Sequence, residues 1–150
     1  MMTADGGRRG RPETNSSLVR PDGLLLDLHP EPEKPSVDIV LAQRQQHLGW
    51  IDNSALIVNI HSARTALAGM LEAHLFAYEG ALVFDVNSHF ASVDEWLRHR
   101  EARRATSIVE PAIIDRARAL MSAQTESELL VSERVQATLL RRGNVGGIAA

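Results

Sequence analysis

The chain has 150 residues, no cysteine, and 16 lysine or arginine residues against 19 aspartate or glutamate residues. This length suits one domain of ordinary size. The lack of cysteine excludes a disulfide framework, a thiolate zinc site and a cysteine nucleophile, and a net charge of −3 gives no global attraction to nucleic acid. We expect no membrane partner, because no stretch approaches the roughly 18 apolar residues that a spanning helix needs. The N-terminus also lacks the order of a secretory signal.

Composition divides the chain into three predicted parts: a flexible or docking arm (1–35), a helical domain (36–142) and a frayed tail (143–150). Glycine and proline are dense in the first part, which disfavours regular secondary structure there. The arm nevertheless holds four leucines within five residues, and leucines are costly to leave in water. Unless the arm simply fluctuates in solvent, it is expected to dock onto the domain or a neighbouring subunit through Leu24, Leu25, Leu26 and Leu28.

The middle of the chain has helical periodicity. Ser36 is suited to cap a helix over residues 36–48, which Gly49 would end. The longest pattern covers residues 53–79, where apolar residues recur alternately four and three positions apart, as in an amphipathic helix. We expect this helix to end at Gly80. Its seam consists of Leu56, Ile60, Ala63, Leu67, Met70, His74 and Ala77.

Two short apolar runs leave an alternative open. Residues 55–60 and 81–86 also resemble strands, and they could pair if residues 62–78 formed a crossover helix. The continuous seam favours a single helix over 53–79. Residues 81–86 are then either a short buried strand or a linker.

Three further helices are predicted in the last third. Ser92 and Glu95 form a capping box that opens a helix through the arginines up to residue 104. Pro111 is tolerated at the first position of a second helix, over 111–122. Another capping box at Thr125 opens a helix that reaches Arg142. The predicted fold class is therefore mainly α, a bundle of about five helices with an extended N-terminal arm, and one short strand pair is the α+β alternative.

The six histidines do not predict a metal site. No His-x-x-x-His or Glu-x-x-His pair places two ligands on one helix face. His74 lies in the apolar seam and is expected to be a packed histidine, or else a proton-sensitive packing position. We therefore predict no metal, no cofactor and no catalytic residue.

The segment Asp52-Asn53-Ser54-Ala55-Leu56-Ile57 resembles the opening motif of PIN-domain ribonucleases, in which an aspartate ends the first strand before a turn of small residues. The resemblance implies a metal-dependent nuclease whose carboxylates converge on divalent ions, and Asp52 is the residue that it carries over. The alternative is that Asp52 and Asn53 cap the following helix.

Residues 104–142 resemble the ribbon-helix-helix fold of small dimeric antitoxins and repressors. The pattern is a short strand over 106–109, a helix from Pro111 to Ser122 and a capped helix from Thr125. The resemblance implies a dimer whose paired strands read the major groove of DNA. The candidate nucleic-acid contacts are Arg103, Arg104 and Thr106. Ordinary helix–turn–helix packing is the alternative, and arginines interleaved with acids also fit a solvated helix face.

We predict a non-catalytic interaction or assembly subunit of the adaptor or scaffold type. Apolar stripes on several helices need more partners than one small chain supplies, so we expect a homo-oligomer or a larger protein assembly. One alternative is a small DNA-binding regulator that uses residues 104–142, although the net charge does not favour nucleic acid as a partner. The other alternative is a PIN-like nuclease around Asp52. The expected location is the cytoplasm, or a virion if a phage encodes the chain.

Overall fold

A single long strand, β5 (Ser127–Arg142), organises the sheet. The computed structural model describes residues 18–143, so the predictions for 1–17 and 144–150 lie outside the described residues. β4 (Phe76–Phe90) pairs with one edge of β5 over nearly its whole length. On the other edge, β1 (Leu24–Pro30) pairs with the C-terminal half of β5 and β2 (Ser36–Leu41) with its N-terminal half. β3 (Arg44–Trp50) continues the sheet from β2, and every pairing is antiparallel.

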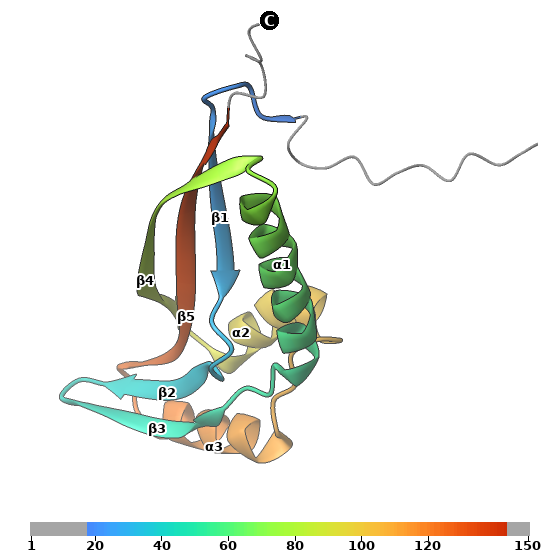
Figure 1. Cartoon of the computed structure of the whole chain (residues 1–150). Helices are drawn as coiled ribbons and strands as arrows, with labels where there is room; N and C mark the ends of the chain where they lie inside the picture. Colours follow the sequence, from blue (N-terminus) through green and yellow to red (C-terminus); the bar gives the residue numbers. More distant parts are fainter. Residues whose placement is uncertain (1–17, 144–150) are drawn as a thin grey trace, which may run out of the picture.

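Three α-helices accompany this sheet in residues 18–143: α1 (Ser54–Glu72), α2 (Val93–Arg100) and α3 (Pro111–Ala123). A short 3₁₀ turn, η2 (Glu101–Arg103), follows α2. Figure 1 shows α1 alongside β1, with α2 and α3 gathered at the end of the sheet that holds β2 and β3. No helix in this part of the chain has the length and apolar content to cross a membrane.

The predicted all-α bundle of five helices is wrong, because a five-stranded antiparallel sheet forms the centre of the fold. Residues 36–48 are the hairpin of β2 and β3, in which Val37, Ile39 and Leu41 alternate toward the core. Residues 127–142 are β5. Both faces of this strand are covered at its start, where the adjacent Leu129 and Leu130 are both buried. A strand that is buried on both faces shows no simple alternation, so its apolar residues also match a helical stripe.

The predicted helix over 53–79 is correct as far as Glu72 and wrong beyond it. Residues 55–60 are helical, as the continuous seam indicated, whereas 81–86 lie within β4. His74, expected in the seam, instead has a φ of 55° and turns the chain from α1 into β4. Ala77, also expected in the seam, lies on β4. The other five residues of the stripe lie on α1, with Ile60 buried and Leu56, Leu67 and Met70 partly buried.

Two predicted helix starts are confirmed. The backbone N–H of Glu95 donates to Ser92 Oγ at 3.1 Å, and the Glu95 carboxylate accepts from the backbone N–H of Ala91 at 2.8 Å. Pro111 occupies the first turn of α3. These starts depend on local side-chain chemistry, which the sequence shows directly.

The main core lies between one face of the sheet and the helices α2 and α3. β2, β3 and the N-terminal part of β5 supply its sheet side, and we call this region the core half. Its most enclosed large side chains include Trp96, Ile39 and Leu129. We call the remainder the distal half: β1, residues 133–142 of β5 and residues 76–86 of β4. There α1 lies against the opposite face of the sheet, where Arg64 contacts His29 and Gln136.

The segment predicted as a docking arm contributes a strand to the distal half. Its leucines alternate in exposure along β1, so that Leu25 is partly buried on the side of α1. Leu24, Leu26 and Leu28 point to the other side and are exposed. The arm's leucines therefore reach both faces of the sheet.

The unequal cover of the two halves predicts unequal costs of truncating leucines. Leu129 is fully buried in the core half, so Leu129→Ala should lower the free energy of unfolding by about 2–5 kcal/mol. Leu26 is 57% exposed in the distal half, so Leu26→Ala should change it by less than about 0.5 kcal/mol. Urea unfolding followed by tryptophan fluorescence measures both, and equal losses would contradict this division of the core.

Candidate functional site

The distal half of the sheet has an uncovered apolar face, which we call the open face. Strand alternation and the pairing of β5 with β1 and β4 place its residues on one side. In register, Leu26 lies opposite Leu139, which lies opposite Gly80 on β4. The open face comprises Leu24, Leu26 and Leu28 on β1, Val135, Ala137 and Leu139 on β5, and Gly80, Leu82, Phe84 and Val86 on β4.

The large side chains of the open face are accessible to solvent. The exposed fractions of its β1 leucines and of Leu82, Phe84 and Val86 run from 37% to 64%. Contiguous exposed apolar patches on a monomer often mark interaction sites. A shallow groove crosses it where small residues lie between large ones. The groove is lined by Leu26, Gly80, Ala81, Leu82, Ala137 and Leu139.

Charged side chains border the open face on β5 only at its two ends. Glu133 and Arg141 fall on this side by strand alternation, at either end of Val135, Ala137 and Leu139. Arg141 forms an ion pair with Glu79 and donates to the backbone oxygen of Asp22 at 3.1 Å. The middle of the face therefore has no charge to oppose the approach of an apolar surface.

One edge of the open face is the outer edge of β4. Within residues 18–143, β4 pairs with β5 and with no other strand. Every residue from Ala81 to Asn87 is exposed. The outward backbone groups of this stretch thus lie beside exposed apolar side chains, a combination that favours strand addition.

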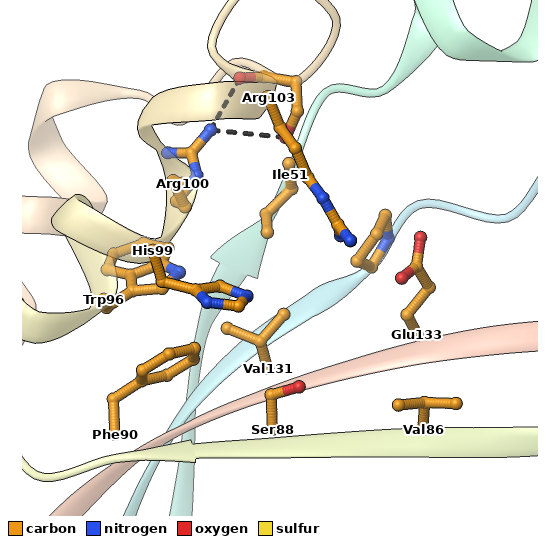
Figure 2. A pocket seen from close by; sticks show the side chains of 12 residues that line it. Ile51, Val86, Ser88, Phe90, Trp96, His99, Arg100, Arg103, Val131 and Glu133 are labelled. Carbon is orange, nitrogen blue, oxygen red and sulfur yellow. Dashed lines mark hydrogen bonds between the residues drawn. The ribbon is translucent and has the colours of Figure 1, made fainter.

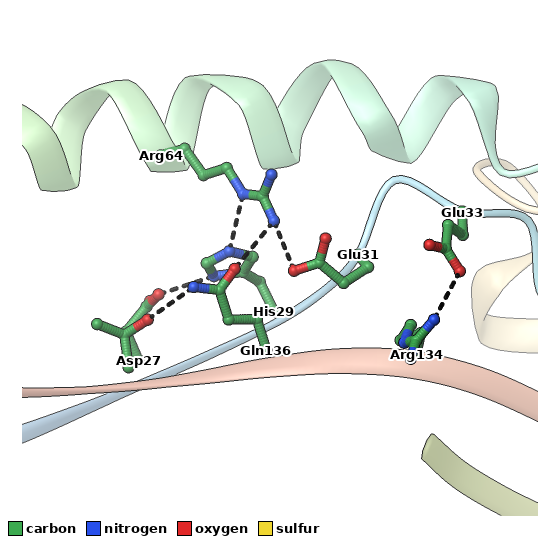
Figure 3. A network of polar contacts seen from close by, with 8 residues as sticks. Asp27, His29, Glu31, Glu33, Arg64, Arg134 and Gln136 are labelled. Atoms are coloured by element: carbon green, nitrogen blue, oxygen red, sulfur yellow. Dashed lines mark hydrogen bonds and ion pairs between the residues drawn. The ribbon is translucent and has the colours of Figure 1, made fainter. Parts of the chain in front are cut away.

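A polar network holds α1 and β1 against β5 (Figure 3). Arg64 donates to His29 Nε2 at 3.1 Å, to Glu31 Oε1 at 2.8 Å and to Gln136 Oε1 at 3.2 Å. His29 Nδ1 lies 2.7 Å from Asp27 Oδ2. Because Arg64 engages Nε2 and Asp27 lies against Nδ1, neither ring nitrogen of the buried His29 is free to act as a general base. The network is a structural support for the distal half.

A small cavity lies where α2 meets the sheet (Figure 2). Its volume of about 70 Å³ is far below that of ordinary ligand pockets, which measure roughly 300–1,000 Å³. Arg100 in its wall donates to the backbone oxygen of Ser107 at 2.6 Å and stacks over Trp96 at 5.4 Å. Burial lowers the pKa of the Arg100 guanidinium. Arg100 is thus used to fix the loop after α2.

The predicted nucleic-acid contacts do not form one surface with a paired ribbon. Arg103 extends into the small cavity toward Glu133 (Figure 2). Arg104 instead forms an exposed ion pair with Glu101 at 3.1 Å, and Thr106 donates to the backbone oxygen of Arg103 at 3.3 Å. The second helix that a ribbon-helix-helix pattern needs is strand β5, so the described part of residues 104–142 lacks that arrangement.

Asp52 lies just before α1, and its side chain is hydrogen-bonded to Ser54, the first residue of that helix. Its Oδ1 accepts hydrogen bonds from the hydroxyl and the backbone N–H of Ser54. Its backbone pairs with Ile108 through two hydrogen bonds of 2.8 Å. No three His, Asp or Glu side chains of residues 18–143 converge where they could hold a metal ion. Asp52 thus bonds the first residue of α1, whereas Asn53, at the N-cap position, makes no side-chain capping hydrogen bond. The described residues around Asp52 lack the convergent carboxylates that the ribonuclease resemblance implies.

Sequence reasoning found three of the ten residues of the open face. It singled out the β1 leucines, although as an arm, and missed Leu82, Phe84 and Val86 as site residues. The signal in the sequence is the apolar run 81–86, which is compatible with either a strand or a linker. The sequence did not show that β5 would bring this run beside β1.

The comparisons with known proteins add no family. No protein-family model matches the chain, and no curated protein or solved structure is significantly similar to it.

The surroundings of Asp52 predict a specific titration. The hydrogen bond from the Ser54 hydroxyl, followed by that from its backbone N–H, holds the pKa of the Asp52 carboxyl below its usual 3.8. Folding is therefore favoured by the ionised carboxylate above the unfolded-state pKa, and this contribution is lost as the pH falls through the folded-state pKa. Carboxyl carbon NMR should show the lowered pKa, and Ser54→Ala should raise it toward 3.8. An unchanged pKa in Ser54→Ala would contradict this assignment.

Proposed function

We propose that this chain is a non-catalytic protein-interaction module of the adaptor or assembly type, with the open face as its docking surface. The observation that carries the proposal is the exposure of six of its large apolar side chains on one continuous, uncharged area. Burial of apolar surface gives about 25 cal/mol per Å², so covering this area supplies a driving force for association.

The rest of the chain is poorly suited to cover this surface. Residues 1–17 and 144–150 contain only four large apolar residues, namely Met1, Met2, Val145 and Ile148. The core half already uses α2 and α3, and α1 lies on the opposite face. These facts support a cover supplied by another protein molecule.

The support beneath the open face suits a docking surface. β1 and β4 are both hydrogen-bonded to β5, and the Arg64 network fixes α1 against the back of β1 and β5. A surface that is already ordered loses little conformational entropy when a partner binds. Flat apolar sheet faces pack on other sheets at about 10 Å.

Site-specific photo-crosslinking tests this proposal. A benzophenone amino acid in place of Leu26 or Leu82 should crosslink to a protein in intact source cells, whether another copy or a different chain. The matched control is Val58, a 66% exposed residue on α1. We expect at least about tenfold more adduct at the open face, because its contacts are desolvated in a complex. Equal labelling at Val58, or no adduct at either leucine, would contradict the proposal.

A further inference from the structure

We propose that the outer edge of β4 pairs antiparallel with the same edge of a second copy of this chain, so that two sheets join into one. The observation behind it is that β4 uses one edge on β5, while its other edge has no strand partner within residues 18–143. This inference goes beyond the proposed function, because it concerns the edge of β4 and names the partner.

This edge lacks the features that keep sheet edges apart. Such features include lysine, proline, bulges and short length. Residues 80–90 of β4 contain no lysine, arginine or proline, and their pairing with β5 is regular. The one register shift lies between Tyr78 and Gly80, at the far end of the strand. The carboxylate of Asp85, the only acid in 80–90, lies 3.8 Å from Arg134 of the same chain.

The other free edges of the sheet are better protected. β1 has seven residues and ends at Pro30, which has no backbone N–H to donate. β3 also has seven residues, begins with Arg44 and contains Gly49, and its pairing with β2 has a register shift. β4 is thus the longest regular edge and the one most open to strand addition.

The arrangement of α1 leaves the β4 edge accessible. α1 packs toward β1, where Ala63, Ala66, Leu67 and Met70 line a groove against Leu25 and Asp27. Figure 1 shows β4 at the margin of the sheet on the side away from α1. α1 therefore lies away from the edge that a second strand would use, and α2 meets β4 at its Phe90 end, where His99 contacts Phe90.

The sequence of β4 is complementary to itself in one register. With a two-fold axis perpendicular to the sheet at Val83, Leu82 of each copy lies opposite Phe84 of the other, on the open face. The two Val83 side chains lie opposite each other on the other face, and Ala81 lies opposite Asp85. Every large apolar residue at the centre of this pairing meets another apolar residue.

Neighbouring registers are less favourable. A centre at Leu82 places Glu79 opposite Asp85, and a centre at Asp85 places two carboxylates directly opposite each other; like charges in these positions are destabilising. A centre at Phe84 sets Val83 against Asp85. Charge and apolar pairing therefore both select the axis at Val83.

The two-fold axis determines where the two open faces lie in the dimer. An axis perpendicular to the sheet leaves both open faces on the same side of the joined sheet. The core halves, with α2 and α3, then lie at opposite ends. The result is one wide apolar surface with two equivalent docking areas.

Single-cysteine variants test the pairing cleanly, because the chain has no cysteine of its own. In full-length Val83→Cys, the Cα atoms of the two introduced cysteines should lie within the roughly 4.4–6.8 Å that a disulfide allows. Mild oxidation should therefore give a covalent dimer in Val83→Cys and not in the control Val58→Cys. Leu26→Cys, on the open face, reports a face-to-face dimer instead.

A charge variant gives a second readout. Val83→Glu, at a 45% exposed position, opposes two carboxylates across the axis and should raise the dimer dissociation constant about 100-fold, while Val58→Glu should not. Light scattering measures the mass, and circular dichroism checks that the fold is retained. A monomeric wild-type chain at high micromolar concentration overturns the inference, as does a dimer that Leu26→Cys traps and Val83→Cys does not. Photo-crosslinking from Leu26 to a different protein in Val83→Glu would still support the proposed function.

Discussion

The fold depends on β5 being hydrogen-bonded along both edges at once. Its backbone groups are satisfied on one side by β4 and on the other by β1 and β2 in succession, so three strands from distant parts of the chain meet on it. Strands bonded on both edges are the most difficult to open, and most of the long-range pairing here involves β5. Removing β5 would leave β1 and β4 without any strand partner among the described residues.

Because β5 is longer than the helical cover, the two halves of the sheet differ. In the core half, α2 and α3 enclose Trp96, Ile39 and Leu129 against one face. In the distal half, one helix covers the opposite face, and the Arg64 network holds it there. The open face is what remains when a sheet of this length is covered by helices that reach only part of it. Exposed apolar area of this size is a cost in a monomer and a driving force in a complex.

Sequence reasoning succeeded where local chemistry decides the structure and failed where distant pairing does. The starts of α2 and α3 follow from Ser92 and Pro111, and α1 follows from a stripe that includes Ile60. The sequence of β5 predicts a helix because apolar residues lie on both faces of the strand, which hides the period of two. The open face could be found only in part, since its β1 and β4 residues are brought together by β5 and not by any local pattern.

Amide hydrogen exchange on the full-length chain tests the role of β5 most directly. Amides from Leu129 to Leu140 should be the slowest to exchange in the protein, with protection continuing from the core half into the distal half. Fast exchange from Val135 onward, at the rate of exposed segments, would show that the distal half is not stably formed. In that case the open face and the edge of β4 would have no fixed geometry on which a partner could dock.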